Sequence, residues 1–187
     1  LNATLARQYD GTTASAGSTL SSFDALQGGE TLTLSGSGTA ASANVANGIT
    51  MSSNGNLALA DGTGAASNYS LNSTVINIAK RVLTSSGSKT YDANTNALDA
   101  NITLSNLVTG EALNHSGTAT ISSANAGSYT ISNLTGITIA DGSGGTASNY
   151  TLTGGTHNFT VNPKVVSIQG NKTYDGNTTI NTSDITA

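Results

Sequence analysis

The acidic residues that could bind a metal ion stand in two glycine-rich stretches. One reads Asp61-Gly62-Thr63-Gly64 and the other reads Asp141-Gly142-Ser143-Gly144. Calcium takes about six to eight oxygen ligands, and several carboxylates must converge on the ion. Each stretch supplies a single carboxylate, and the other acids lie far away in sequence. We therefore expect turns, with Asp61 and Asp141 as weak calcium candidates and no required cofactor.

The histidines and serines offer no clear route to catalysis. His115 and His157 are isolated in sequence, whereas a zinc site requires about three or four protein ligands. Serines are abundant, but no Gly-x-Ser-x-Gly elbow surrounds one of them. We find no catalytic constellation and predict that the chain is not an enzyme.

A tyrosine–aspartate pair recurs at nearly constant spacing. It occurs as Tyr9-Asp10-Gly11, Tyr91-Asp92-Ala93 and Tyr174-Asp175-Gly176, and the tyrosine numbers differ by 91 − 9 = 82 and 174 − 91 = 83. Aspartate and glycine favour a turn, and a tyrosine beside it would bury its ring and give its hydroxyl a backbone partner. Because Ala93 replaces glycine in the second copy, a left-handed backbone is not expected to be obligatory there. We interpret these residues as structural.

A second landmark repeats with almost the same period. Ala66-Ser67-Asn68-Tyr69-Ser70-Leu71 returns as Ala147-Ser148-Asn149-Tyr150-Thr151-Leu152, and here the tyrosine numbers differ by 150 − 69 = 81. A fixed period of this kind indicates a tandem array. We predict module 1 at residues 1–79, module 2 at residues 80–163, and a C-terminal segment at residues 164–187 that begins a third, incomplete module. Tyr69 and Tyr150 should be buried at equivalent positions.

The composition narrows the classes of partner. The chain of 187 residues is 9% charged and 4% aromatic, has a net charge of −4 and contains no cysteine, whereas roughly 25% of an ordinary domain is charged. Six basic residues do not make the concentrated basic surface that nucleic acid requires. No apolar run approaches the roughly 18 residues of a membrane span. We expect no membrane insertion in this segment, and any export signal should lie upstream of it.

Apolar and polar residues alternate throughout the chain, for example at Ile76/Ile78, Ile137/Ile139 and Phe159/Val161. This period of two is typical of half-buried strands. No helical pattern persists over ten residues, and the best helical candidate is residues 20–26. We predict an all-β fold with little or no helix. It should be an elongated tandem array of β-sandwich-like or β-grasp-like modules, each as long as the interval between the repeated tyrosines.

The junction between the modules is short. Ile78 and Val82, which we expect to belong to different strands, are separated only by Ala79-Lys80-Arg81. At about 3.3 Å per extended residue, the chain has little room to double back. We expect the modules to lie end to end, with a small and mostly polar interface.

Together, these motifs and the Asn162-Pro163-Lys164 junction resemble the YDG/MBG-type repeats of very large bacterial surface adhesins. Such adhesins include filamentous-haemagglutinin-like proteins exported by two-partner secretion. The resemblance implies an all-β module that is repeated many times, has no enzymatic residues, and lies outside the cell or on the bacterial surface.

From this resemblance we expect a non-enzymatic, semi-rigid stalk or spacer that acts in cell-surface or biofilm adhesion. Its partners would be glycan, polysaccharide or protein of a host or bacterial surface, contacted through other parts of the chain, with self-association as a further possibility. Two alternatives remain open: a filament assembled by β-strand addition, and a glycan-binding module. The low aromatic content and the absence of tryptophan disfavour the latter.

Overall fold

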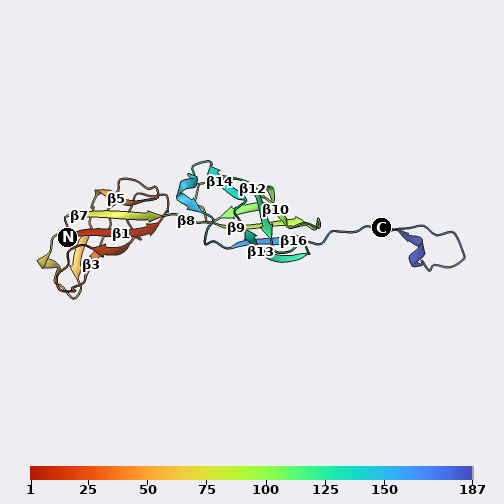
Figure 1. The fold of residues 1–187 in the computed structure, drawn as a ribbon, viewed down its shortest axis with the longest axis horizontal. Coiled ribbons are helices and arrows are strands. Elements are labelled where there is room, and N and C mark those ends of the chain that lie inside the picture. Colours follow the sequence, from red (N-terminus) through yellow and green to blue (C-terminus); the bar gives the residue numbers. More distant parts are fainter. Residues whose placement is uncertain (187) are drawn as a thin grey trace.

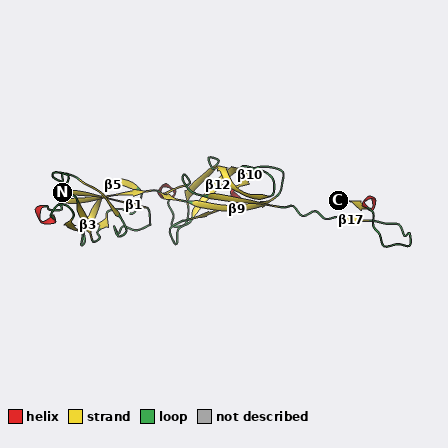
Figure 2. Cartoon of the chain, turned by 90° about the horizontal axis from the view of Figure 1, so that it is seen from below, coloured by secondary structure: helices red, strands yellow, loops and turns green. Residues whose placement is uncertain are grey.

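The computed structural model describes residues 1–186, apart from the side chains of residues 132 and 133. The described chain consists of strands, loops and four helical turns of three residues each (Figure 2). The all-β prediction is therefore confirmed. Two strand-rich bodies follow one another along the long axis, and the C-terminal segment lies beyond an extended stretch (Figure 1).

Module 1 is built on a five-stranded sheet with the order β2-β1-β7-β5-β4, beside which β3 and β6 form a separate pair. The short helix η1 (Ala66–Asn68) precedes the last strand. The strands are β1 (Asn2–Gln8), β2 (Thr19–Phe23), β3 (Leu32–Ser35), β4 (Thr39–Ala40), β5 (Ala46–Ser53), β6 (Ala58–Asp61) and β7 (Ser73–Ala79).

Module 2 has the strand order β10-β12-β13-β16-β9-β11, with β14 paired to β12, while β8 pairs with β15. Its short helices are η2 (Asp99–Asn101) and η3 (Ala147–Asn149). The strands are β8 (Arg81–Val82), β9 (Thr84–Thr90), β10 (Asn96–Leu98), β11 (Ile102–Ser105), β12 (Leu113–Ile121), β13 (Gly127–Asn133), β14 (Ile137–Asp141), β15 (Tyr150–Thr151) and β16 (His157–Asn162).

The first and last long strands of each module are parallel neighbours inside the sheet. β1 and β7 pair from Asn2↔Ser73 to Gln8↔Ala79, and β9 and β16 pair from Ser85↔His157 to Thr90↔Asn162. The other pairings in these two sheets are antiparallel. A mixed sheet with a parallel central pair is closer to the grasp-like expectation than to a sandwich of two antiparallel sheets.

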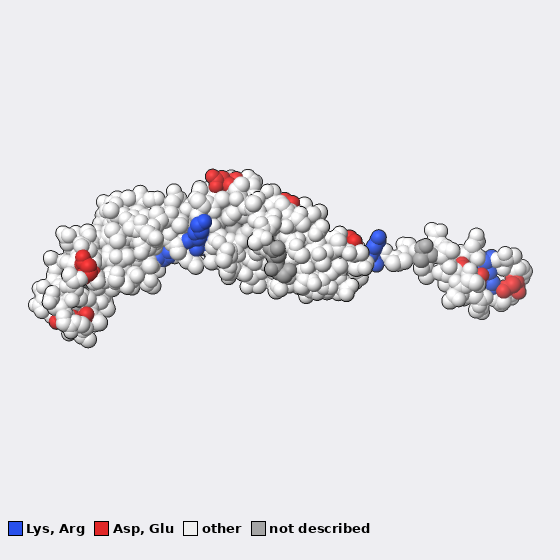
Figure 3. Space-filling view, viewed as in Figure 1, with Lys and Arg blue, Asp and Glu red and all other residues white. Residues whose placement is uncertain are grey.

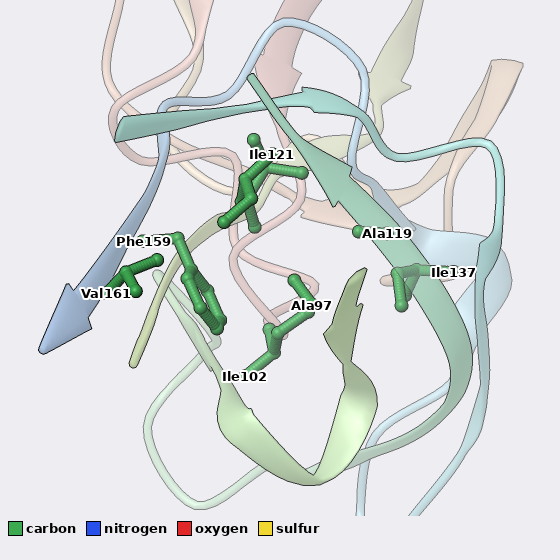
Figure 4. Close-up of a cluster of buried hydrophobic side chains, with 8 residues drawn as sticks. Ala97, Ile102, Ala119, Ile121, Ile137, Phe159 and Val161 are labelled. Atoms are coloured by element: carbon green, nitrogen blue, oxygen red, sulfur yellow. The ribbon is translucent and has the colours of Figure 1, made fainter. Parts of the chain in front are cut away.

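The alternating pattern in these strands produces the cores. In β7, Ile76 and Ile78 are buried, and in β16 the buried apolar residues are Phe159 and Val161. Figure 4 shows Phe159 lying among aliphatic side chains from several strands of module 2. Gly87 of β9 makes room for that ring, because a Cβ there would lie 2.8 Å from the ring carbons.

Two local details differ from the sequence patterns considered above. Residues 20–26 do not form a helix: Thr19–Phe23 is strand β2, in which Leu20 pairs with Leu5 of β1. The junction is also shorter than expected, because β7 continues through Ala79 and β8 begins at Arg81. Only Lys80 lies between the two strands, so the chain crosses from one module to the other without a loop.

The C-terminal segment contains β17 (Gln169–Gly170), η4 (Thr182–Asp184) and β18 (Ile185–Thr186). Gly170 pairs with Ile185, as Gly87 pairs with Ile102 in module 2. The two offsets agree, since 170 − 87 = 83 and 185 − 102 = 83. The segment therefore repeats the β9–β11 register of module 2. Val165 and Val166 nevertheless remain 88% and 68% exposed.

Candidate functional site at the module joint

One carboxylate of module 2 binds two tyrosines that come from different modules. The Tyr9 hydroxyl donates to Glu111 Oε1 at 2.7 Å, and the Tyr150 hydroxyl donates to Glu111 Oε2 at 2.7 Å. The two rings meet edge to face, with centroids 5.4 Å apart. Edge-to-face pairs contribute beyond simple burial, so ring contact and hydrogen bonding act together at the joint.

Strand ends bring these side chains together. Tyr9 follows β1, and its N–H donates to the carbonyl oxygen of Ala79 at the end of the parallel strand β7 at 2.9 Å. Tyr150 opens β15 directly after η3, while Glu111 lies two residues before β12. The parallel pairing thus carries Tyr9 to the end of module 1 at which module 2 begins.

The joint is largely apolar, which contradicts the expected mostly polar interface. Tyr9, Leu83 and Tyr150 are 5%, 0% and 1% exposed, and they belong to one cluster with Ile76 and Ile78 of module 1. The expectation failed because it considered only the residues of the short junction. Ile78 and Leu83 flank the junction in sequence, whereas Tyr9 and Tyr150 reach the same apolar cluster from distant positions.

Polar contacts surround this apolar centre. The Asn149 side chain is 1% exposed; it accepts from the Val45 N–H at 2.9 Å and donates to Asn44 Oδ1 at 2.9 Å. The Arg81 guanidinium donates to the carbonyl oxygens of Asn106 at 2.6 Å and of Tyr9 at 3.4 Å. The side chains of Asn149 and Arg81 in module 2 thus hydrogen-bond to module 1, which favours one relative orientation of the modules.

The glycine of the first Tyr-Asp-Gly copy has a specific role in the joint. Gly11 has φ +78°, and a Cβ at this position would lie 2.9 Å from Val108 Cγ1 and 3.3 Å from Glu111 Oε1. A side chain here would disfavour the backbone conformation and push against module 2. Gly11 therefore allows the close approach of the two modules.

The environment of the tyrosines keeps them as hydrogen-bond donors. Burial, together with the neighbouring Glu111 carboxylate, raises the pKa of Tyr150 to about 12. Burial and the same carboxylate also raise the pKa of Tyr9. Both effects disfavour the phenolate, so the two hydroxyls stay protonated well beyond neutral pH.

The second copy of the motif corrects an inference from sequence. Ala93 has φ 64°, close to the values of Gly11 and Gly176, which are 78° and 79°. The left-handed conformation is therefore present in all three copies, including the one with alanine. Such a conformation is costly for a residue with a Cβ, and alanine adopts it here because the hydrogen bonds of the turn fix the backbone.

Those hydrogen bonds surround a cation that sequence reasoning missed. Lys89, two residues before Tyr91, contacts Asp92 Oδ1 at 2.8 Å, and its ammonium donates to Asn94 O, Asn94 Oδ1 and Asn96 O at 2.8, 2.9 and 2.8 Å. Only 6% of its side chain is exposed. The signal in the sequence was a basic residue three positions before each motif aspartate.

The other two copies have the same arrangement. Lys172 contacts Asp175 Oδ1 at 2.8 Å and donates to Asn177 Oδ1 at 2.6 Å and Thr179 O at 2.6 Å. In the first copy, Arg7 pairs with Asp10. The motif is thus a turn folded around a largely buried cation, and its aspartate is a counter-ion.

A comparison with protein families identifies the repeat. A model of the YDG domain matches residues 2–76 and again residues 79–158. The chain belongs to the YDG domain family. Comparisons with curated proteins and with solved structures gave no significant match. The two matched segments correspond to the two sheets described above, and each contains one cation-centred turn of the YDG motif.

The two weak calcium candidates have turn roles in the YDG modules. Asp61 Oδ1 accepts from the Ala66 N–H at 2.7 Å, and Asp141 Oδ1 accepts from the Ala147 N–H at 2.7 Å. Each bond ties the glycine-rich loop to the short helix that follows. No group of three or more metal-binding side chains is present among the described residues.

The remaining predicted tyrosines differ in burial. Tyr150 is buried as expected, but its equivalent Tyr69 is only partly buried, so the prediction of full burial was wrong for Tyr69. Tyr91 and Tyr174 are 39% and 94% exposed, whereas Tyr9 is 5% exposed. Equivalent YDG tyrosines are thus buried only where another module covers them.

Within residues 1–186, no helix is long and apolar enough to cross a membrane.

One pair in module 2 has hydrogen-bond geometry suited to a nucleophile. Ser85 Oγ lies 2.9 Å from His157 Nδ1, and His157 Nε2 lies 2.9 Å from the Leu152 carbonyl oxygen. The carbonyl requires a proton on Nε2, so Ser85 donates to Nδ1. Both side chains are buried, at 5% and 7% exposure, and they face each other across β9 and β16. This position fits a bond that joins two strands.

Proposed function

We propose that this chain is a semi-rigid stalk segment of an extracellular bacterial adhesin and that it resists tension along its length. In this role it holds a separate binding region away from the cell surface and performs no chemistry. The adhesin's partner would be a surface glycan, polysaccharide or protein contacted by other parts of the chain. The proposal rests on membership of the YDG family, on the resemblance to adhesin repeats, and on the following mechanical feature.

The observation that carries the proposal is the parallel pairing of the first and last long strands in both modules. Tension applied at the start of β1 and the end of β7 pulls these strands in opposite directions along their common axis. The seven residue pairs from Asn2↔Ser73 to Gln8↔Ala79 then share the load, because parallel ladders have evenly spaced bonds. Module 2 repeats this geometry between Ser85↔His157 and Thr90↔Asn162.

The joint supports transmission of that load. Only Lys80 separates β7 from β8, and Tyr9 and Tyr150 converge on Glu111 from the two modules. A stalk needs both features, since its modules must resist unfolding and must not fold back on one another. A flexible linker would transmit tension but would not hold a binding region at a distance.

Single-molecule force spectroscopy tests the proposal within module 1. The chain has no cysteine, so handles can be attached at introduced pairs. Asn2→Cys with Ala79→Cys pulls opposite ends of β1 and β7 and loads the ladder in shear. Asn2→Cys with Ser73→Cys pulls the same end of both strands and peels the bonds one by one. We expect a clearly higher unfolding force for the first pair; equal forces would remove the mechanical basis of the stalk.

A second candidate function is a filament completed by strands from another chain. The C-terminal segment exposes 68% of Val166 and 60% of Ile180, whose equivalents in module 2, Leu83 and Ala97, are both 0% exposed. Added strands could bury these apolar groups. Concentration-dependent association in analytical ultracentrifugation, abolished by Val166→Ser with Ile180→Ser, would support this candidate. A chain that remains monomeric at high concentration would exclude it.

A further inference from the structure

Module 1 carries a second copy of the joint on the side facing away from module 2. Tyr69 donates to Glu30 Oε2 at 2.5 Å, as Tyr150 donates to Glu111 Oε2 at 2.7 Å. The tyrosines and the glutamates are offset equally, since 150 − 69 = 81 and 111 − 30 = 81. The same carboxylate oxygen is therefore occupied by the equivalent tyrosine in both modules.

The surrounding backbone is repeated as well. The Gln27 N–H donates to the Tyr69 hydroxyl at 3.3 Å, and the Val108 N–H donates to the Tyr150 hydroxyl at 3.1 Å. Ala25 and Asn106, each two residues earlier, both have positive φ, at 54° and 67°. A non-glycine residue rarely adopts this conformation, so its recurrence shows that module 1 builds the same receiving loop as module 2.

The chain also enters both modules in the same way. The Leu83 N–H donates to the Thr151 carbonyl oxygen at 2.8 Å. The Leu1 amino group donates to the Ser70 carbonyl oxygen at 2.8 Å. Leu1 thus occupies in module 1 the position at which the chain arriving from module 1 enters module 2.

The difference between the two copies is the missing tyrosine. Glu111 Oε1 accepts from Tyr9, whereas no partner of Glu30 Oε1 occurs among the described residues. Tyr69 and Asn68 are more exposed than their equivalents Tyr150 and Asn149, which are each 1% exposed. The unfilled copy has the same groups in the same arrangement, with one carboxylate oxygen left to accept a hydrogen bond.

We propose that this surface, the Glu30 socket formed by Gln27, Glu30, Asn68 and Tyr69, binds the Tyr-Asp-Gly end of another YDG module joined in front of Leu1. The incoming tyrosine donates to Glu30 Oε1 and packs edge to face on Tyr69, as Tyr9 does at Glu111 and Tyr150. The loop that follows the fourth strand of that module pairs with the Asn68 side chain, as Asn44 and Val45 pair with Asn149.

A module in the same chain fits this socket better than a separate copy of the protein does. In the filled joint, strand β7 runs through Lys80 directly into β8 and Leu83. The module that docks and the chain that enters therefore arrive from the same side. In a separate copy, Tyr9 is already bound to Glu111, so the free tyrosine–aspartate end is that of module 2. Residues 163–187 follow that end and would be brought to the place that Leu1 occupies.

This inference rests on the proposed stalk function and names the partner that binds the Glu30 socket. It can be tested by disulfide cross-linking across the joint. In the filled joint, a Cβ on Gly11 would lie 3.8 Å from Val108 Cβ, which matches the roughly 3.8 Å separation found in disulfides. Gly11→Cys with Val108→Cys should therefore oxidise readily in the 187-residue chain. The disulfide yield of this pair is the reference value for a joint in which the tyrosine is bound.

The socket is tested in a longer chain in which an extra copy of residues 1–82 precedes Leu1. One cysteine replaces Gly11 of the extra copy and the other replaces Gln27 of the original module 1. We expect this pair to oxidise to the same extent as the calibrating pair, and Glu30→Ala to reduce the yield sharply. Without any cysteine, hydrogen exchange at the Gln27 N–H should slow relative to the 187-residue chain.

A low disulfide yield equal to that of the Glu30→Ala variant, with unchanged exchange at Gln27, would overturn the socket. Efficient oxidation that is insensitive to Glu30→Ala would also overturn it, because proximity alone would then explain the cross-link. Neither result affects the force measurement on module 1, so the socket and the stalk can fail separately.

Discussion

At the scale of single residues, Glu111 is the centre of the joint. It is the only carboxylate among the described residues that accepts from two tyrosine hydroxyls, and those tyrosines are 5% and 1% exposed. Glu30 offers a matched comparison in the same protein, because it accepts from Tyr69 alone and in a more exposed setting. A comparison of Glu111 with Glu30 separates the contribution of the joint to the free energy of unfolding from the contribution of a single tyrosine–carboxylate hydrogen bond.

Replacement of Glu111 by alanine should reduce the free energy of unfolding by about 2–3 kcal/mol, since hydrogen bonds to a charged group are lost from buried donors. Glu30→Ala should cause a clearly smaller loss, because the Tyr69 hydroxyl can turn to water. Chemical denaturation of both variants measures the difference. Equal losses would mean that the joint adds nothing to the stability of the modules.

Two positions of the YDG turn should respond in opposite directions to substitution. Ala93→Gly should raise the free energy of unfolding by about 0.5–1 kcal/mol, because relief of left-handed strain exceeds the added entropy of the unfolded chain. Gly11→Ala should lower it by about 1–2 kcal/mol from strain alone, and more because of contact with Val108. Thermal unfolding of the two variants checks both signs.

At the scale of elements, the YDG turn is held by charge and hydrogen bonds. Asn94 and Asp92 both bind the Lys89 ammonium, and the hydrogen bond from Lys89 lowers the pKa of Asp92. Lys172 lowers the pKa of Asp175 in the same way. A carboxyl whose pKa falls on folding stabilises the folded state above its ordinary pKa and loses that contribution as pH falls through the folded pKa.

The melting temperature should therefore fall as the pH drops below about 4. In the Asp92→Asn variant, part of this loss should already be present at neutral pH, and the further fall in acid should be shallower than in the wild type. Calorimetry from neutral pH down into strong acid compares the two profiles. Parallel profiles would show that the Lys89–Asp92 contact does not stabilise the fold.

Much of the secondary structure could be predicted from sequence, because alternation such as Ile76/Ile78 or Phe159/Val161 directly reflects a strand with one buried face. The repeat also followed from sequence, through the recurring tyrosines. The joint could not be predicted, since Tyr9 and Glu111 are 102 residues apart and nothing local marks Glu111 as their meeting point. The best helical candidate, residues 20–26, is not helical, since Thr19–Phe23 forms strand β2 and Leu20 pairs with Leu5 of β1.

At the scale of the whole molecule, the two modules lie in line and their charged groups are sparse. The face in Figure 3 shows scattered acidic and basic atoms on a mainly uncharged surface, in keeping with 9% charged residues. Long-range charge therefore does little to orient the modules. Their alignment depends on the joint, where Leu83 and Tyr150 are buried against module 1.

Small-angle X-ray scattering of the 187-residue chain tests this end-to-end arrangement most directly. A compact globule of this length would have a radius of gyration of about 16 Å. We predict a clearly larger value, with a distance distribution that extends along one axis and broadens in the Glu111→Ala variant as the joint loosens. A radius near the compact value would mean that the modules pack side by side and would contradict the account.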